Sequence, residues 1–375
     1  MSWQRGKKAL PGRLPASLRV GSRSVQANES VETPVNDEDV DSDLDLVALG
    51  SPLLDVLDTT ADDVLARVGL VKGSMTLIDL AQAGAVQQLM TAPRFVSGGS
   101  VANTAVGLSE LGGRAGFIGA VADDEVGHTY VENLRAAGVE FEPVYGASPE
   151  ADALGTGRCI VLISEDAERT MATYLGAAST LNISGVPDAL VARAAIVLLE
   201  GYLWDVDAAK EAMRHAAATA HDADGSVALS LSDSFCVSRH QREFLDLLVD
   251  DVDILLGNEE EITMLFGATS YKGALDAAEE TGLLVVMTRG AQGSVVLTAH
   301  GPEEVPAAPV AQVVDTTGAG DLFAAGLLYG LTHGMHPVDS ARLGGLCAAE
   351  VISHTGARPE ADLRALAAAA GLLGS

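Results

Sequence analysis

Apolar runs of strand length and amphipathic stretches of helix length alternate along the chain from residue 44 onward. The continuous apolar runs lie at 44–50, 115–121, 194–201, 227–233 and 252–258. The stretches with helical character lie at 128–138, 205–223, 238–251, 259–267 and 319–334. Two more strand-like runs, 283–290 and 293–299, are close enough to pair directly.

This alternation predicts the fold class. Strands that are each followed by a helix form parallel βαβ units, so we expect an α/β protein with a doubly wound, mainly parallel sheet flanked by helices. The strands are apolar throughout rather than alternating, which is typical of a sheet covered on both faces. The length of 375 residues suits one large α/β domain or two ordinary ones.

Two regions, 58–97 and 145–180, do not follow this alternation of apolar strands and amphipathic helices. They contain shorter runs of alternating polarity, such as 158–163 and 169–175. We expect them to form a small β-rich layer inserted into the main domain. Ligands of doubly wound sheets bind at the carboxyl ends of the strands, so a layer there would act as a lid.

The first 43 residues differ from the rest in charge. Residues 1–24 hold six basic residues and no acid, whereas residues 29–45 hold eight acids and no base. With little hydrophobic periodicity, residues 1–43 are predicted to be a disordered extension ahead of a domain at 44–375. An organelle transit peptide and a mis-called start codon are open alternatives.

Composition excludes several classes of function. A net charge of −29 repels phosphate backbones, which argues against a nucleic-acid binder. No run of 18 apolar residues suggests a membrane span. Cys159, Cys236 and Cys347 are far apart in the sequence, and we expect buried thiols in a reducing, cytoplasmic compartment.

The most informative motif is VVDTTGAGDLFAAG at 313–326. A strand runs into Gly318, Ala319 and Gly320, which open an apolar helix, so their amides are free to bind an anion. Asp321 in the first turn is suited to accept a proton from a hydroxyl that attacks phosphorus. The alternative is an ordinary strand–helix turn in which Asp321 interacts only with the helix dipole. The chain has no GxxxxGK[ST] string, so it is not a P-loop NTPase.

This motif resembles the second signature of the PfkB/ribokinase family of carbohydrate and nucleoside kinases. Four other segments match that family in its order along the chain: FVSGGSVANTAVGLSELGG (95–113), GNEEE (257–261), TRGAQGS (288–294) and AAEVISHTGARP (348–359). The resemblance implies a ribokinase-like fold and an ATP-dependent phosphotransferase with an alcohol acceptor.

The resemblance also implies roles on the phosphate side of the site. Asp321 would be the general base, and the amides at 318–320 would stabilise charge on the transferring group. Asn258 and Glu261 would organise Mg²⁺, with Glu261 acting through water. The same two residues also suit the start of a helix. Asp315 would hold a monovalent cation such as K⁺.

Four more positions would contact ATP by the same resemblance. Thr288, Gly290 and Gly293 would border the phosphates and ribose, although the segment equally fits a β-hairpin turn. His354, in the segment that closes over the nucleotide, would be a further contact. Asn258 would also belong to the nucleotide site.

The acceptor side involves residues from three segments. Asp55 suits a vicinal diol, and Gly98, Gly99 and Asn103 would bring backbone and an amide to the acceptor. Arg169 would reach the γ-phosphate or the product. The alternatives are a strand-end acid, a capped strand–helix turn and a surface arginine.

The acceptor itself stays open between two classes. GSPLLD (50–55) and VKGSMTLID (71–79) resemble the adenosine-kinase-like branch, which favours the adenosine 5′-OH and AMP as product. RTMATYLGA (169–177) is frequent in sugar kinases, so ribose, fructose or 2-keto-3-deoxygluconate is the alternative. The chain is only 4% aromatic, and Phe95, Tyr174 and Leu77 are the candidate walls for a base. A non-catalytic sensor is a remote alternative, and the protein would be a monomer or a homodimer through the lid.

Overall fold

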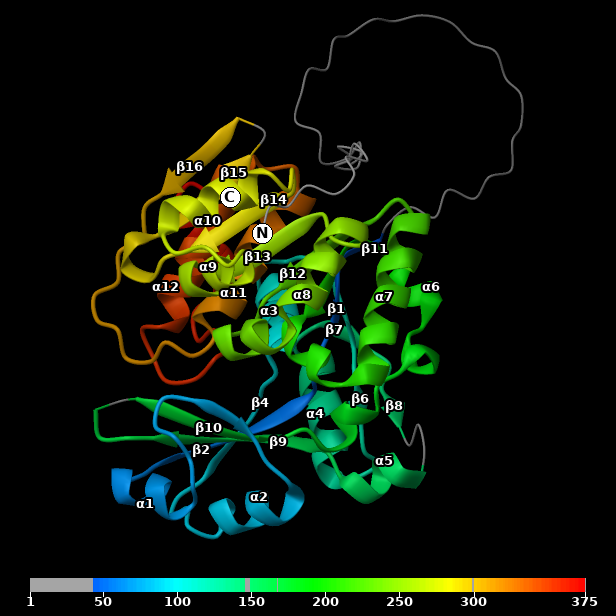
Figure 1. Ribbon diagram of the computed structural model, residues 1–375, viewed down its shortest axis with the longest axis vertical. Coiled ribbons are helices and arrows are strands. Elements are labelled where there is room, and N and C mark those ends of the chain that lie inside the picture. The colour runs from blue at the N-terminus through cyan, green and yellow to red at the C-terminus, as the bar shows by residue number, and fades with distance from the viewer. Residues whose placement is uncertain (1–42, 146–148, 167, 299, 375) are drawn as a thin grey trace, which may run out of the picture.

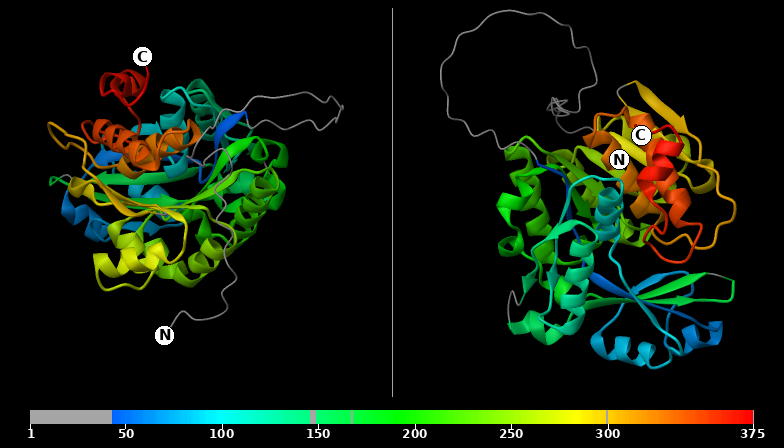
Figure 2. Two further views of the ribbon diagram at one scale, coloured as in Figure 1. Left: turned by 90° about the horizontal axis from the view of Figure 1, so that it is seen from above. Right: turned by 180° about the vertical axis from the view of Figure 1, so that it is seen from behind.

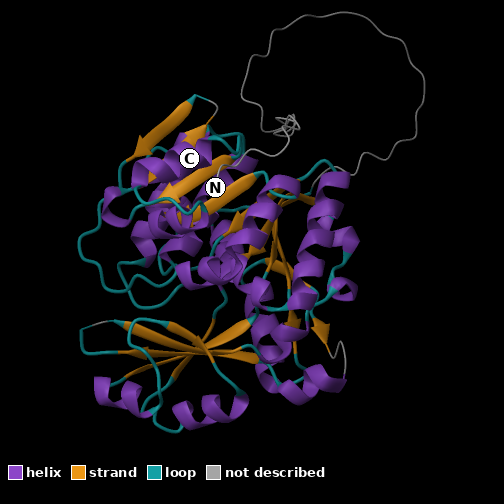
Figure 3. Cartoon of the chain, viewed as in Figure 1, coloured by secondary structure: helices purple, strands orange, loops and turns teal. Residues whose placement is uncertain are grey.

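The computed structural model describes residues 43–374 except 146–148, 167 and 299. The predicted extension 1–43 therefore lies outside the described residues except for its last residue. Figure 1 shows the chain as a large α/β layer with a smaller sheet beneath it, and Figure 3 shows the same arrangement by element type.

The main sheet has nine strands. Their spatial order is β16 (Gly301–Val305), β15 (Ser294–Thr298), β14 (Leu284–Thr288), β13 (Ile254–Asn258), β12 (Ser226–Ser230), β11 (Ala194–Glu200), β1 (Leu44–Leu49), β5 (Ala115–Ile118) and β7 (Val139–Phe141). The seven strands from β14 to β7 are parallel, β15 is antiparallel to β14, and β16 is antiparallel to β15. The predicted mainly parallel sheet is confirmed.

Helices cover both faces of this sheet, as Figure 2 shows from above. In β1, Leu46 and Ala48 belong to one buried cluster and Val47 and Leu49 to the other, because successive side chains point to opposite faces. One face packs against α3 (Ser100–Glu110), α4 (Glu125–Ala136), α11 (Ala319–Thr332), α12 (Pro337–Val351) and α13 (Leu363–Ala369). The other packs against α6 (Asp188–Val191), α7 (Asp207–Asp222), α8 (Ser234–Asp250), α9 (Glu259–Leu265) and α10 (Tyr271–Glu279).

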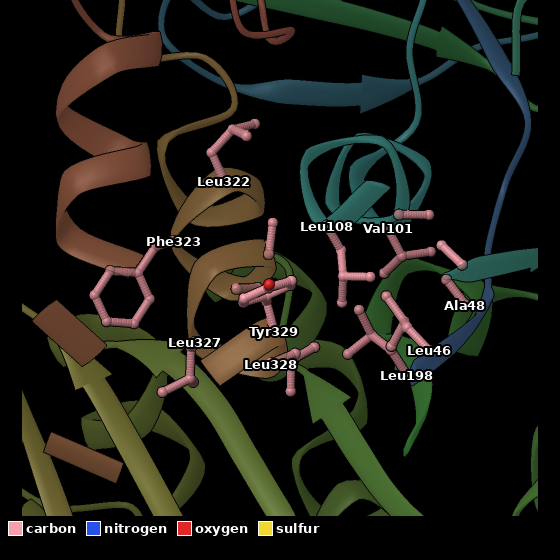
Figure 4. Close-up of a cluster of buried hydrophobic side chains, with 14 of the residues drawn as sticks. Leu46, Ala48, Val101, Leu108, Leu198, Leu322, Phe323, Leu327, Leu328 and Tyr329 are labelled. Carbon is pink, nitrogen blue, oxygen red and sulfur yellow. The ribbon is translucent and has the colours of Figure 1, made fainter. Parts of the chain in front are cut away.

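Helix α11 is almost entirely enclosed. Its residues from Leu322 to Leu331 are all buried, and Figure 4 shows part of this cluster against α3. A Cβ added at Gly107 of α3 would lie 2.6 Å from Leu322 and 2.8 Å from Ala325. Only glycine therefore permits this helix contact, which fixes the start of α11 relative to α3.

The smaller sheet has five strands. Their order is β3 (Met75–Leu77), β10 (Arg169–Tyr174), β9 (Gly157–Ile163), β2 (Leu53–Thr59) and β4 (Arg94–Ser97). One face packs on α1 (Asp62–Arg67) and α2 (Leu80–Gln87) through a cluster that includes Val56 and Ile160. The sheet begins earlier than the predicted insertion at 58, and α5 (Pro149–Leu154) is not part of it.

Shorter elements complete the described chain. The apolar run predicted as one strand over 115–121 divides at Gly119 into β5 and β6 (Ala120–Val121), and β6 pairs with β8 (Val144–Tyr145). Single 3₁₀ turns lie at Gly176–Thr180, Ile183–Gly185, Gly201–Asp205 and Gly290–Gln292. The three cysteines are buried thiols, as predicted. Among the described helices, none combines the length and apolar character that a bilayer crossing requires.

Candidate active site

A cavity of about 660 Å³ lies between the carboxyl ends of the main-sheet strands and the inner face of the smaller sheet. Glu200 of β11 and Ser230 of β12 line it from the main sheet, and Val161 and Met171 line it from the smaller one. Most of the predicted site residues line this cavity: Asp55, Gly99, Asn103, Arg169, Asn258, Glu261, Thr288, Gly318, Ala319, Gly320 and Asp321.

The glycine-rich turn opens α11 with a left-handed residue. Gly318 has a φ of +77°, and a Cβ there would lie 2.8 Å from the Cα of Ala357. Both the φ and the close backbone require glycine. The amide of Ala319 donates to the Thr316 carbonyl at 3.2 Å, so the remaining first-turn amides are the ones free to face an anion.

The Asp321 carboxylate is held by two side chains from α3. Ser100 Oγ donates to Oδ1 at 2.7 Å, and Asn103 Nδ2 donates to Oδ2 at 2.9 Å. Burial raises the pKa of Asp321, while these two hydrogen bonds and the charge of Arg358 oppose the rise. An oriented carboxylate with raised proton affinity is suited to general-base chemistry.

Asp55 of β2 packs directly on Gly98. A Cβ at Gly98 would lie 2.2–2.4 Å from the Asp55 carboxyl atoms, so this contact also requires glycine. Burial raises the pKa of Asp55 to about 7, with Arg358 opposing the rise. Tyr130 donates to the Gly98 carbonyl at 2.8 Å and fixes the strand end against α4.

Arg169, the first residue of β10, forms an ion pair with Asp315. The carboxylate of Asp315 also accepts from the amides of Thr317 (2.9 Å) and Gly356 (2.7 Å), so both of its oxygens have donors. Arg169 Nη1 is buried and has no hydrogen-bond partner among the described residues. A monovalent cation at Asp315 would have to compete with this guanidinium.

Asn258 and Glu261 form a reciprocal cap at the start of α9. The Glu261 amide donates to Asn258 Oδ1, and the Asn258 amide donates to Glu261 Oε2, each at 2.9 Å. Burial raises the pKa of Glu261 to about 7. Because both residues also line the cavity, the helix-cap interpretation and a nucleotide-side role are compatible.

Three predicted nucleotide residues do not line the cavity. Gly290 and Gly293 flank the turn between β14 and β15, next to Thr288, which does line it. His354 Nε2 lies 3.1 Å from Glu350 Oε1, one helical turn earlier in the chain. The assignment of these three to ATP stays a prediction.

The apolar wall of the cavity differs from the one expected. Leu77 lines it, but Phe95 is 56% exposed and Tyr174 packs on the far side of the smaller sheet. The wall consists instead of thioether and aliphatic side chains such as Met75 and Met171. Sequence reasoning looked for aromatic residues and overlooked these.

Two charged residues of the site were also missed. Glu200 ends β11, lines the cavity and accepts from the Ser51 amide at 2.7 Å, and burial raises its pKa to about 7. Because Glu200 follows an apolar strand directly, the sequence could have predicted that it lies at the ligand-binding edge of the sheet. Arg358, in the loop after α12, acts on Asp55 and Asp321 through its charge, and nothing in the local pattern indicated this.

The model of the pfkB family carbohydrate kinases matches residues 65–363, which is most of the chain. This chain belongs to the PfkB family. Members are phosphotransferases that act on hydroxyl groups, and the chain is a PfkB kinase with a ribokinase-like fold whose acceptor is a sugar or a nucleoside.

Relatives of both acceptor classes resemble the chain. The solved structure of an adenosine kinase from Sinorhizobium meliloti is 39% identical, with a TM-score of 0.82 over 88% of this chain and 99% of that one. A probable sugar kinase from Rhizobium etli CFN 42 is 37% identical, with a TM-score of 0.83 over 88% and 100%. A 5-dehydro-2-deoxygluconokinase from Bacillus thuringiensis (strain Al Hakam) is 26% identical over 72% of this chain and 83% of that protein.

Proposed function

We propose that this PfkB kinase transfers the γ-phosphoryl group of ATP to the primary hydroxyl of a nucleoside, with adenosine and its 5′-OH as the acceptor and AMP as the product. The observation that carries the proposal is the position of Asp321. Its carboxylate is held by Ser100 and Asn103 at the free N-terminus of α11, beside a cavity with an apolar wall.

The nucleoside assignment draws on the cavity and on one relative. The wall that includes Met75, Leu77, Val161 and Met171 suits the flat apolar face of a base, and Asp55 suits a ribose diol. The Sinorhizobium meliloti adenosine kinase is 39% identical to this chain. The runner-up acceptor is a sugar, because a relative is named 5-dehydro-2-deoxygluconokinase.

The proposed reaction uses the chain's own groups in three ways. Asp321 accepts the proton of the attacking hydroxyl, and the first-turn amides of α11 stabilise charge on the transferring phosphoryl group. Arg169 lines the cavity, and its Nη1, buried without a partner among the described residues, would donate to the same charge. The smaller sheet serves as the lid and excludes water from the transfer.

Mg²⁺ would enter this site with the phosphates of ATP. No group of three or more His, Cys, Asp or Glu side chains in the described part of the chain is arranged to hold a metal ion. Glu261, with Asn258 beside it, fits contact through the ion's water shell. The bound ion would neutralise phosphate charge. K⁺ at Asp315 stays a prediction, and no step of the proposed reaction depends on that ion.

A coupled kinase assay tests the acceptor. Purified protein with MgATP is offered adenosine, other nucleosides, ribose, fructose and 2-keto-3-deoxygluconate in parallel. We expect kcat/KM for adenosine to exceed that for each sugar at least about a hundredfold, which corresponds to roughly 3 kcal/mol of discrimination. Faster turnover of a sugar would contradict the nucleoside assignment and leave the phosphate-side roles in place. Binding of ligands without any turnover would favour a sensor.

A further inference from the structure

The face of the smaller sheet that lines the cavity presents its side chains in rows across the strands. Asp55 of β2 lies opposite Cys159 of β9. Thr173 of β10 lies opposite Cys159 on one side and Leu77 of β3 on the other. All four residues line the cavity, because directly opposite side chains point to the same face of a sheet. One row therefore leads from a carboxylate past a thiol and a hydroxyl to an aliphatic side chain.

This row is open to a ligand on one side of Asp55 only. On the other side lies β4, where Val96 is opposite Asp55. None of the β4 residues Arg94–Ser97, all of which the structure describes, lines the cavity. Neighbouring strands are about 4.8 Å apart, so Thr173, two strands from Asp55, lies about 10 Å from it across the sheet. A ligand whose diol is bound at Asp55 therefore extends along this sheet towards Cys159 and Thr173.

Thr173 is the polar point of an otherwise apolar stretch of this wall. Among the described strand residues of the smaller sheet that line the cavity, it alone carries a hydroxyl. Its Oγ1 donates to Cys159 Sγ at 3.5 Å, and a thiol is a weak acceptor, so the hydroxyl remains available to a better partner. The adjacent row places the apolar side chains of Val161 and Met171 opposite each other. A flat ligand on this wall would thus meet a hydroxyl at a single position.

We propose that Thr173 is a specificity-determining residue whose hydroxyl forms a hydrogen bond with the polar edge of the acceptor's base. The inference rests on the proposed function, because it concerns a nucleoside bound through its diol at Asp55. A free pentose at Asp55 covers the first step of the row, whereas the base of a nucleoside extends over the second. The hydroxyl both donates and accepts, so it suits a ring nitrogen or an exocyclic amine. A site that hydrogen-bonds a substrate group discriminates against ligands without that group, so Thr173 favours nucleosides over free sugars.

The test compares the wild type with Thr173→Val, which removes the hydroxyl, and Thr173→Ser, which keeps it. Thr76→Val is the matched control, because Thr76 lies on the adjacent strand β3 and does not line the cavity. We expect Thr173→Val to raise the KM and the calorimetric Kd for adenosine about 5- to 10-fold, the range for one neutral hydrogen bond. Its kcat, its KM for ATP and the inhibition constant of ribose should stay within about twofold. Thr173→Ser and the control should bind adenosine like the wild type.

Two results would overturn the inference: an unchanged Kd for adenosine in Thr173→Val, or an equal weakening of adenosine and ribose, which would indicate a general change in the shape of the wall. If Thr173→Val does not fold, Thr173→Ala removes the same hydroxyl and decides with the same two ligands. A wild type that phosphorylates no nucleoside refutes the proposed function. A wild type that phosphorylates adenosine, together with a Thr173→Val variant that binds it equally well, refutes this inference alone.

Discussion

Three carboxyl groups around the cavity share one electrostatic property. Burial raises the pKa of Asp55, Glu200 and Glu261 to about 7 in the folded protein. In the unfolded chain these groups ionise near their ordinary values of about 4. Between these values the folded protein binds more protons than the unfolded one, so their contribution to stability falls as the pH rises from about 4 to about 7.

Glu200→Gln tests this property at one residue. Glutamine still offers an oxygen to the Ser51 amide but carries no charge to bury. The variant should gain stability relative to the wild type as the pH rises from 4.5 to 8, by at most about 3 kcal/mol. Urea unfolding at both pH values measures the difference, with the exposed Glu132→Gln as control. A difference that stays constant with pH would contradict the effect of burial.

Asp55→Asn separates acceptor binding from nucleotide binding. The substitution removes a charged acceptor of hydrogen bonds next to Gly98. We expect the acceptor KM to rise roughly 10- to 100-fold, the range for a lost bond to a charged group, while the KM for ATP stays within about threefold. Asp63→Asn, exposed on α1, is the control. Equal changes in both KM values would show that Asp55 does not act on the acceptor alone.

At the scale of elements, the geometry of the site depends on the packing that holds the first turn of α11 in place. The burial of α11 between α3 and α12 fixes its axis, and Gly318 turns the chain into its first turn. The loop after α12 then crosses this turn through Ala357 and brings Arg358 behind it. The geometry of the anion-binding amides therefore depends on contacts between segments far apart in the sequence.

A pair of glycine substitutions tests this dependence. Gly318→Ala introduces a Cβ at a φ of +77° and 2.8 Å from Ala357, whereas a Cβ at Gly320 meets nothing within 4 Å. Gly318→Ala should lower the free energy of unfolding by about 1–3 kcal/mol and reduce kcat. Gly320→Ala, in the helix, should change stability by less than about 1 kcal/mol. Equal destabilisation in denaturant unfolding would contradict a special role for the turn at Gly318.

The pattern of the chain predicts some elements better than others, for physical reasons. Seven of the nine strands of the main sheet are continuous apolar runs and were predicted to within a few residues, whereas the two edge strands, the short β7 and the polar β16, were missed. Helix α12 was missed, and its last residues, 348–351, were assigned by motif resemblance to the segment that closes over the nucleotide. The carboxylates of the site follow strands or open helices and were mostly found, but Arg358 was not, because it lies in the loop after α12, where no local pattern indicates a role.

At the scale of the whole molecule, two of the short connections between the smaller sheet and the main layer lie beside the acceptor residues. Residues 50–52 separate β1 from β2, and residues 98–99 separate β4 from α3. Asp55 and Gly98 lie next to these connections, so any movement of the smaller sheet would shift the acceptor residues relative to Asp321. Whether the protein is a monomer or a homodimer through this sheet, and its cytoplasmic location, stay predictions.

Deleting residues 2–42 should leave the kinase intact. Every residue assigned to the site lies between Asp55 and Arg358, and the first strand begins at Leu44. We expect kcat, both KM values and the melting temperature of the truncated protein to match those of the full chain within about twofold. A large loss of activity in a folded truncation would mean that the N-terminal segment contributes to the site.

The central claim is that Asp321 accepts the proton of the acceptor hydroxyl in a cavity formed by both sheets. The most direct measurement is kcat for Asp321→Asn and the wild type at saturating MgATP and acceptor, with calorimetric binding of both ligands to each protein. The account predicts a kcat lower by about 10²- to 10⁴-fold, with affinities within about threefold. A variant that binds both ligands and keeps kcat within tenfold of the wild type would contradict it.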